Sequence, residues 1–590
     1  MTKEWYVNEE KAWFNTWWPK DMPKNIEIEH LTIGEVFERQ RKKYADQNLI
    51  WFLDSWMTYE EVGKLVDLVA TSLHNLGLRK GDVFCMLMPN CFQYYITFFA
   101  CQKLGVTVTG LNPTYKSLEI LHQIETCNVK ALMCIGALYD MLVKPIIDKT
   151  RIELIITTGI ADLVKGSLSL EEFITKKTRR IRKPKIDFDP VINFYELLTT
   201  EPNLPDVKID PDEVSATYLM TGGTTGVPKA CVLTHFNFSS LMKPAALKFG
   251  GDEPGTCLIG IFPMFHVAGV AVTLMMPLLL GGWVMMFAAP PSVEDLLKTV
   301  DKLPTERGVF LVMAELYFKR IIEFPHIDQY KDTLKKFRLN MNGAGPLHAP
   351  VREAYQKITG GRLIDGYGLT ESSGTASGGT LWTEYPLGTL GVPFIGTDWA
   401  IFDANDFEKG PIADGLPGSK YGEEHVGELC LCGPQMMKEY LNKPEETADT
   451  LKKWDGRTWL RTGDIGFMAE DGTVTLRDRK KQLIKVAGHS VFPTEVETML
   501  MMHEAVSEAA VAGFPDPEEK LGEITKAWVA LQPEYIGKIS EDELKAWMKE
   551  NMTYWKCPAI IEFIDEVPKN MVGKVQRRAL QEADPLFKKN

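Results

Sequence analysis

The chain has 590 residues, too many for one ordinary hydrophobic core, and 45% of them are hydrophobic, so we expect a folded protein of several domains rather than a disordered one. A formal net charge of −13 argues against a general nucleic-acid binder, which needs a basic field. The ten cysteines show no zinc-site spacing, which favours a reducing, cytoplasmic compartment. On a strand, Cys430 and Cys432 would share one face and need not pair.

Alternating strand and helix patterns follow an aromatic N-terminal segment. Residues 1–30 hold Trp residues without periodicity, and we expect an arm that wraps the body on apolar anchors. A capping box of Thr58 with Glu61 predicts the start of a helix, and Gly77 predicts its end. The strand–helix–strand order predicts a parallel α/β sheet with right-handed crossovers. Further helices are expected at 31–43, 92–104 and 118–127, and strands at 49–53, 83–88, 106–111, 131–134 and 154–157.

Two stretches raise the question of membrane contact. Residues 267–289 are uncharged and long enough to span a bilayer, but Pro277 and the glycine pair 281–282 favour a buried helix, a turn and a buried strand. Residues 176–185 form a dense basic run, for which we favour a solvated surface loop; the alternative is contact with an anionic membrane surface. The first residues lack the continuous apolar region of a signal peptide.

A loop rich in glycine and threonine carries the first sign of chemistry. Its backbone amides and hydroxyls can donate to phosphoryl oxygens, and the lysine that closes it adds positive charge. The spacing differs from that of a Walker loop, and on the residues alone a surface turn is an alternative. The loop consists of Thr221, Gly222, Gly223, Thr224, Thr225, Gly226, Val227, Pro228 and Lys229.

A second segment offers groups suited to a nucleotide. Tyr367, between Gly366 and Gly368, has a ring that can stack on adenine. Thr370 offers a hydroxyl to a phosphate, and Glu371 is a hard oxygen ligand of the kind that Mg²⁺ prefers. Taken alone, a Gly-Tyr-Gly turn is weak evidence for a nucleotide site, so the interpretation depends on its position downstream of the phosphate-type loop.

Five other positions or segments have structural interpretations when each is taken alone. His266 would be an ordinary core or surface histidine, and residues 342–347 a strand-to-helix turn. Asp464 would lie in a plain turn, and Lys574 would be a basic surface residue. Residues 478–489 would be a charged linker.

Together and in this order, the segments resemble the signatures of the adenylate-forming superfamily, which includes acyl-CoA synthetases, luciferases and peptide-synthetase adenylation domains. The loop at 221–226 is similar to the variant common in fatty acyl-CoA synthetases, whereas Ala230 departs from the family's usual glycine. The resemblance covers residues 30–580. It implies an α/β (mixed α+β) fold with a large N-terminal domain, 1–477, of two α/β subdomains plus a β-rich subdomain. A hinge at 478–482 and a small mobile C-terminal α+β domain, 483–590, would follow.

The same resemblance implies an AMP-forming acyl-CoA synthetase that uses ATP, Mg²⁺ and coenzyme A, with a medium- or long-chain fatty acid as the expected substrate. The implied catalytic residues are Lys574, Thr370, Glu371 and His266, and Glu371 is also the implied Mg²⁺ ligand. The implied contacts with nucleotide and coenzyme A are Thr221, Gly222, Gly223, Thr224, Thr225, Gly226, Lys229, Gly343, Ala344, Gly345, Asp365, Gly366, Tyr367, Gly368, Asp464, Arg479, Lys481, Lys485 and Gly488.

Members of this superfamily form an acyl-adenylate and then rotate the small domain for the second step, which would place the hinge near Lys481. Two alternatives stay open: an enzyme that passes the adenylate to another acceptor, and a non-enzymatic acyl or nucleotide sensor. The presence of Lys574 and Glu371 argues against the sensor. A different acid, short-chain, hydroxy or aryl, and a homodimer also stay open.

Overall fold

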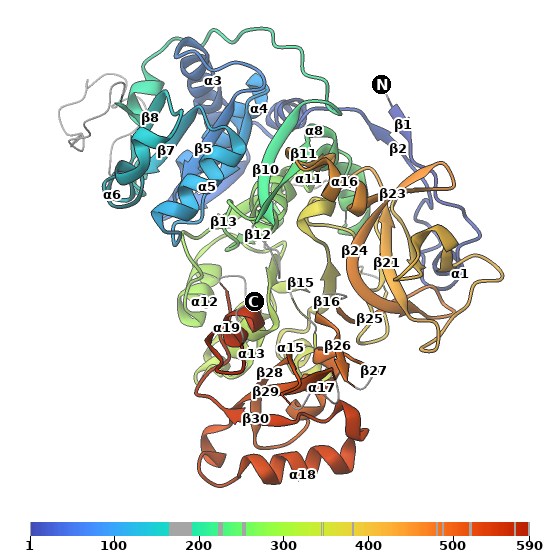
Figure 1. The fold of residues 1–590 in the computed structure, drawn as a ribbon. Coiled ribbons are helices and arrows are strands. Elements are labelled where there is room, and N and C mark those ends of the chain that lie inside the picture. The colour runs from blue at the N-terminus through green and yellow to red at the C-terminus, as the bar shows by residue number, and fades with distance from the viewer. Residues whose placement is uncertain are drawn as a thin grey trace.

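The computed structural model describes residues 2–164, 191–221, 228–250, 255–343, 345, 347–379, 383–479, 482–486, 489–517, 522–570 and 574–587. Figure 1 shows their arrangement, with the C-terminal part in orange and red below the rest of the molecule. The basic run 176–185 lies outside the described residues. So do these predicted site residues: Gly222, Gly223, Thr224, Thr225, Gly226, Ala344, Lys481 and Gly488.

The first sheet contains eight described strands in the order β22-β11-β10-β6-β5-β7-β8-β9. Parallel pairing among β5, β6, β7 and β8 confirms the predicted α/β sheet. The strands are β5 (Val83–Leu87), β6 (Thr107–Gly110), β7 (Ala131–Ile135), β8 (Leu154–Thr158), β9 (Val191–Asn193), β10 (Ser215–Thr221), β11 (Lys229–Thr234) and β22 (Glu439–Tyr440). The main helices of this part are α3 (Tyr59–Asn75), α4 (Phe92–Leu104) and α5 (Ser117–Cys127), with α6 (Gly136–Leu138) and α8 (His235–Ser239) shorter.

The helix α3 has both ends where the sequence predicts them. The Thr58 hydroxyl accepts from the Glu61 amide at 3.2 Å, and the Glu61 carboxylate accepts from the Thr58 amide at 2.7 Å. Beyond the helix, Gly77 adopts a φ of +95°, which residues with a β-carbon rarely take. Local chemistry therefore accounts for both ends of this helix.

The second sheet contains nine described strands in the order β18-β17-β16-β15-β14-β12-β13-β3-β4. The strands are β3 (Asn48–Phe52), β4 (Ser55–Thr58), β12 (Cys257–Gly260), β13 (Trp283–Met286), β14 (Val309–Met313), β15 (Phe337–Asn342), β16 (Arg362–Tyr367), β17 (Ser377–Gly378) and β18 (Val392–Pro393). Helices of this part are α2 (Ile33–Lys43), α9 (Met242–Lys248), α12 (Val293–Lys302), α13 (Glu315–Ile322), α14 (Lys331–Leu334) and α15 (Ala349–Thr359).

The uncharged stretch 267–289 folds as a buried helical segment followed by a buried strand, as predicted. The helical part consists of α10 (Val267–Gly269), a π-helical turn (Val270–Met275) and α11 (Met276–Leu279), and β13 then enters the second sheet. In the described part of the chain, no helix combines the length and the apolar character needed to cross a membrane.

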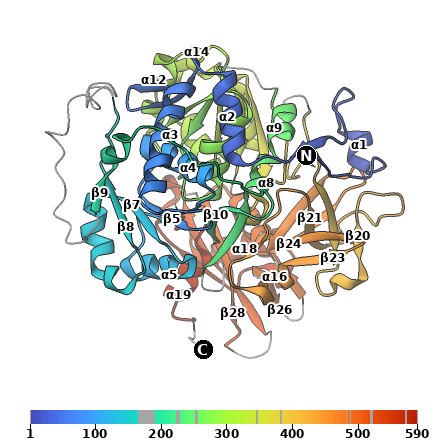
Figure 2. The same ribbon diagram turned by 90° about the horizontal axis from the view of Figure 1, so that it is seen from above.

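A third, antiparallel sheet forms the β-rich part, with the order β20-β19-β21-β24-β23 and β25 paired to β24. The strands are β19 (Asp398–Phe402), β20 (Pro411–Ala413), β21 (Gly427–Cys432), β23 (Leu451–Trp454), β24 (Arg457–Met468) and β25 (Val474–Arg479), and α16 (Pro444–Thr450) precedes β23. The N-terminal segment lies beside this sheet in Figure 2, and the buried Trp13 ring meets Trp399 at a centroid distance of 6.1 Å. The predicted arm is therefore confirmed, although the sequence missed its regular elements, β1 (Thr2–Glu4), α1 (Ala12–Thr16) and β2 (Glu27–Glu29).

The C-terminal part builds its own core around a three-stranded sheet, β28-β29-β30. The buried Glu497 of α17 accepts two hydrogen bonds from Arg577, at 2.8 and 2.5 Å, which ties the end of the chain to this core. The elements are β26 (Ile484–Val486), β27 (His489–Val491), α17 (Pro493–Met501), β28 (Val506–Pro515), β29 (Glu523–Leu531), α18 (Glu541–Asn551), β30 (Ile560–Phe563) and α19 (Arg577–Ala583).

All ten cysteines lie among the described residues and none forms a disulfide. Nine are buried, and only Cys557, in the C-terminal part, is partly exposed. Cys430 and Cys432 belong to one core cluster on β21, so they share a face as predicted.

Candidate functional site

The ends of the glycine- and threonine-rich loop face each other across a hairpin. Thr221, the last residue of β10, pairs with Lys229, the first of β11. The Lys229 ammonium lies 4.2 Å from the centre of the Tyr440 ring. The methyl group of Ala230, the residue that departs from the family pattern, is buried in the hydrophobic core of the first sheet. The hairpin thus fixes both ends of the loop and points its lysine at an aromatic face.

The second predicted segment lies at the carboxyl end of β16 and passes close to this hairpin. After Tyr367 ends the strand, a short 3-10 turn (Thr370–Ser372) packs against β10 and β11. A β-carbon on Gly368 would lie 2.3 Å from the Gly374 carbonyl oxygen, and one on Gly366 would lie 2.4 Å from the Met341 sulfur. Gly368 is therefore required for the close approach of a neighbouring backbone segment, whereas a side chain at position 366 would displace the flexible Met341 side chain.

Asp464 lies at the centre of a polar group that joins three strands. The Tyr367 hydroxyl donates to its Oδ2 at 2.5 Å, and the Arg479 guanidinium lies 3.0 Å from its Oδ1. Asp464 and Arg479 are cross-strand partners on β24 and β25. The Asp464 charge raises the pKa of Arg479. The plain-turn interpretation of Asp464 is wrong, because the residue lies within the long strand β24, next to Gly463 with a φ of +73°.

Glu371 is held by a residue that the sequence did not single out. The Tyr440 hydroxyl donates to Glu371 Oε1 at 2.7 Å, and the backbone carbonyl of Glu371 accepts from the Met437 amide at 2.7 Å. Burial, then the Glu371 charge, raises the pKa of Tyr440, so its hydroxyl stays protonated and acts as donor. In the sequence, Tyr440 is marked only by its aromatic side chain, in a segment apart from the predicted motifs.

The segment after β15 forms a second polar group. The Asn342 side-chain amide donates to Asp365 Oδ1 at 2.7 Å and to the Gly345 carbonyl at 2.6 Å. Burial raises the pKa of Asp365 to about 7, against the opposing effect of Asn342. Gly343 and Gly345 leave open space at this edge. A β-carbon on Gly343 would meet only Val312, at 3.9 Å, and one on Gly345 would meet no atom within 4 Å. The edge can therefore accept a flat group close to backbone.

His266 is the N-cap residue of α10, and its Nδ1 accepts from the Ala268 amide at 3.2 Å. Burial, with a further contribution from the Lys574 charge, lowers the pKa of His266 to about 4. The imidazole is therefore neutral at pH 7 and suited to hydrogen bonding rather than to ion pairing.

Lys574 belongs to the C-terminal part but faces the large domain. Its amide donates to Asn570 Oδ1 at 2.9 Å, and its carbonyl accepts from the Asn570 amide at 2.9 Å, which closes a small loop. The residue is exposed, and desolvation, then the charge of Arg479, lowers the pKa of Lys574, while the charges of Asp464 and Glu371 oppose this. Lys574 therefore shares one electrostatic neighbourhood with residues from β24, β25 and the 3-10 turn.

Lys485 occupies a different setting. It lies on β26 with an exposed side chain, and its backbone amide donates to the Glu523 carboxylate at 2.6 Å.

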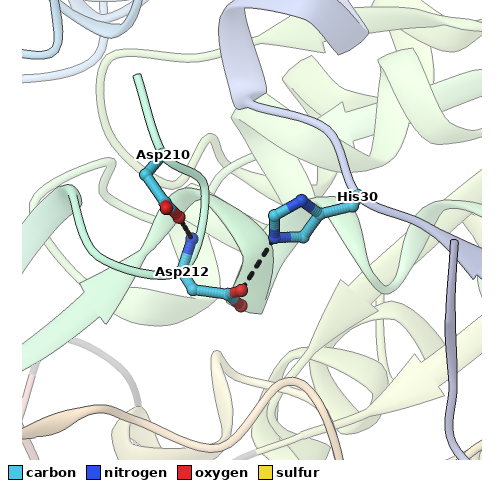
Figure 3. A group of neighbouring side chains, drawn as sticks. All are labelled: His30, Asp210 and Asp212. Carbon is cyan, nitrogen blue, oxygen red and sulfur yellow. Dashed lines mark hydrogen bonds and ion pairs between the residues drawn. The ribbon is translucent and has the colours of Figure 1, made fainter. Parts of the chain in front are cut away.

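A separate group of possible ligand atoms, drawn in Figure 3, consists of His30, Asp210 and Asp212. His30 Nε2 and Asp212 Oδ2 lie 2.8 Å apart, and Asp210 Oδ1 accepts from the Asp212 amide at 3.0 Å. The group precedes β10, whereas Thr221 ends it, so about 20 Å of strand separates it from the phosphate-type loop. We interpret it as a turn that fastens the N-terminal segment to the body.

Comparisons with known proteins identify the family to which the sequence and the fold are similar. A model described as "AMP-binding enzyme" matches residues 37–441, and one described as "AMP-binding enzyme C-terminal domain" matches residues 495–574. The long-chain-fatty-acid–CoA ligase of Bacillus subtilis (strain 168) is 32% identical over 592 residues, covering 98% of this chain and 99% of that protein. The protein of the same name from Yersinia pestis is 32% identical over 585 residues, covering 98% of each chain.

Among solved structures, ATP-bound MatB from Rhodopseudomonas palustris matches with a TM-score of 0.78 and 22% identity, covering 95% of this chain and 100% of that one. At this identity the likeness concerns the fold, and it confirms the predicted α/β class. The two family models match separate stretches, residues 37–441 and 495–574, and together span most of the sequence. The chain therefore belongs to the AMP-binding enzyme family.

Proposed function

We propose that the protein joins a medium- or long-chain fatty acid to coenzyme A at the expense of ATP, through an acyl-adenylate, and releases AMP and pyrophosphate. The observation that carries this proposal is the place of Lys574, whose ammonium shares its surroundings with Asp464, Glu371 and His266. The names of the Bacillus and Yersinia relatives support the fatty acid and the thiol acceptor.

ATP would lie across the carboxyl ends of β10 and β16, where ligands of α/β sheets bind. We assign Asp464, oriented by Tyr367 and Arg479, to the ribose hydroxyls. The loop at 221–229 would hold the β- and γ-phosphates, and Thr370 the α-phosphate. Adenine would lie against Tyr367 and the open edge formed by Gly343, Ala344 and Gly345, with Asp365 and Gly366 behind it.

The residues fit a magnesium ion carried by the triphosphate. Mg²⁺ prefers one or two carboxylates together with phosphate oxygens and water. Glu371 supplies one carboxylate beside the phosphate-type hairpin, with Oε1 already held by Tyr440. When bound, the ion would neutralise phosphate charge; Glu371 is the residue that we assign to it.

In the first half-reaction, the substrate carboxylate attacks the α-phosphorus of ATP and expels pyrophosphate. Negative charge grows on the phosphoryl oxygens, so positioned donors and cations lower the barrier. Lys574 would contact the carboxylate and the bridging oxygen. The neutral His266 would orient the acyl carboxylate without repelling Lys574.

In the second half-reaction, the coenzyme A thiol attacks the acyl carbonyl and expels AMP. In our assignment Lys574 would lie in front of the adenylate and block the thiol, so we propose that the small domain, 483–590, turns about the hinge 478–482 relative to the large domain, 1–477. The backbone near Gly488, together with Lys485, would then approach the pantetheine arm. The exposed setting of Lys485 on β26 supports a role that begins only after this rotation.

Replacing Lys481 by proline is expected to spare adenylation but to slow thioester formation by about tenfold or more, since proline fixes φ at the hinge. Pyrophosphate release and acyl-CoA formation would be measured separately. Lys481→Ala, which removes the charge but keeps backbone freedom, is the control. Undiminished acyl-CoA formation by the proline variant would remove Lys481 from the hinge.

The remaining proposals concern the protein's surroundings. We propose a cytoplasmic location. For the run 176–185 we favour a solvated loop, and flotation with vesicles that contain anionic lipid tests the alternative, peripheral membrane contact. Light scattering on the purified protein distinguishes a monomer from a homodimer.

The proposed function is tested by measuring AMP release with ATP, Mg²⁺ and carboxylic acids from acetate to palmitate, plus aromatic acids, each with and without coenzyme A. We expect turnover that depends on coenzyme A and peaks on an alkyl chain of medium or greater length. Adenylate that accumulates without any response to coenzyme A would instead indicate a different acceptor. A peak on an aromatic acid would contradict the fatty acid assignment.

A further inference from the structure

Tyr440 lies between two charged side chains that the proposed function uses for different parts of the same ligand. Its hydroxyl donates to Glu371 Oε1 at 2.7 Å, and its ring centre lies 4.2 Å from the Lys229 ammonium. Lys229 comes from the end of the phosphate-type loop, whereas Glu371 comes from the 3-10 turn after β16. One side chain therefore contacts two segments that are more than a hundred residues apart in sequence.

The backbone around Tyr440 is fixed on both sides. The strand β22 pairs with β11, so Tyr440 lies opposite Cys231. The Leu441 amide donates to the Ala230 carbonyl at 2.9 Å, next to Lys229 itself. The Tyr440 amide donates to the Thr447 hydroxyl at 3.0 Å, and only 5% of the residue is exposed. Because its backbone is fixed, the Tyr440 ring has little freedom to move toward Glu371 or Lys229. The positions of these two side chains therefore depend on the position of the ring.

We propose that Tyr440 is a positioning residue that sets the place of Glu371 relative to Lys229, and so couples contact with the metal ion to contact with the terminal phosphates. The inference rests on the proposed function, because it assumes that both side chains meet Mg²⁺ and ATP. A carboxylate held through one oxygen presents the other in a defined direction, which a metal ion with strict octahedral geometry requires. The ring face attracts the lysine ammonium and so favours its position beside the phosphate-type loop.

The two contacts use different parts of the side chain and can be separated by mutation. Tyr440→Phe removes the hydroxyl but keeps the ring beneath Lys229. Tyr440→Leu removes both. Tyr59→Phe is the matched control, because this buried tyrosine donates to the Gly282 carbonyl at 2.7 Å between α3 and the second sheet.

ATP binding is measured by calorimetry as a function of free Mg²⁺, a readout that needs no turnover, together with the Mg²⁺ dependence of adenylate formation. For Tyr440→Phe we expect the Mg²⁺ concentration at half-saturation to rise by about tenfold, with metal-free ATP binding unchanged. Tyr440→Leu should show the same rise and also weaker metal-free binding. Tyr59→Phe should show neither change.

A double-mutant cycle with Glu371→Gln shows whether the hydroxyl acts through this carboxylate. Tyr440→Phe should add nothing to the Mg²⁺ dependence of Glu371→Gln, because the carboxylate on which the hydroxyl acts is already lost. An unchanged Mg²⁺ dependence in Tyr440→Phe, or full additivity in the cycle, would overturn the proposal. Absence of ATP binding in the wild-type protein would instead contradict the proposed function itself.

Discussion

Replacement of Lys574 by alanine is expected to lower the rate of pyrophosphate release by about a thousandfold, since removing one positioned electrostatic contact commonly costs two to three orders of magnitude. In the present arrangement the ammonium shares its surroundings with Asp464 and Glu371, where charge would develop on the α-phosphate. Thioester formation from a synthetic acyl-adenylate and coenzyme A should change little, because in our proposal Lys574 has by then left the site. The two half-reactions would be measured separately on the same preparation.

The control for this prediction is Lys549→Ala, which removes an exposed lysine from α18 of the same small domain. Both half-reactions should stay at the wild-type rate in that variant. Equal losses of both half-reactions in Lys574→Ala would contradict the assignment, since they would place the lysine in the site throughout the cycle.

Replacement of Asp464 by alanine is expected to weaken ATP use, seen as kcat/KM, by about 10² to 10³. The Asp464 carboxylate accepts a hydrogen bond from Tyr367 and pairs with Arg479. In our assignment it would also accept two charge-assisted hydrogen bonds from the ribose hydroxyls, and the variant would lose these as well. Most of the loss should appear in KM for ATP, because the ribose contacts change little between ground state and transition state. Steady-state kinetics with varied ATP measures it.

Substrate analogues isolate the ribose contact from any general damage to the strand pair β24–β25. The wild-type protein should discriminate strongly against 2′-deoxy-ATP and 3′-deoxy-ATP, and Asp464→Ala should discriminate much less. Glu470→Ala, an exposed change on the turn of the same hairpin, is the control. If Asp464→Ala keeps the full preference for ATP, another group holds the ribose.

Elements governed by local chemistry could be predicted from the sequence. The cap at Thr58 and the stop at Gly77 both follow from neighbouring residues. Pairings between strands that are far apart in the sequence could not be predicted in this way. The strand β3 joins the second sheet through β13, more than two hundred residues later, and no periodic pattern carries that information.

The same distinction holds for the candidate site. Motif order placed Tyr367 and Asp464 near one ligand, and the structure joins them by a hydrogen bond. Asn342, which fixes Asp365, stood inside a predicted motif but had no assigned role, because its importance arises from the neighbouring strand. No pattern in the sequence indicated a role for Tyr440. Its two contacts arise from the pairing of β22 with β11, which lie about two hundred residues apart in the chain. The roles given to these residues stay predictions until the variants are measured.

The distribution of thiols makes the protein its own reporter of domain movement. Burial shields nine of the ten cysteines, so a maleimide dye should attach at Cys557, the partly exposed thiol of the small domain. Burial also raises the pKa of the Cys557 thiol, so mildly alkaline labelling is needed to form the thiolate. The dye would travel with the small domain while the native tryptophans of the arm, such as the buried Trp13, stay with the β-rich sheet. Energy transfer from the arm would be masked by Trp547 and Trp555, which lie in the same cluster as Cys557, so the fluorescence of the dye itself would report a change in the surroundings of the small domain, without an engineered cysteine.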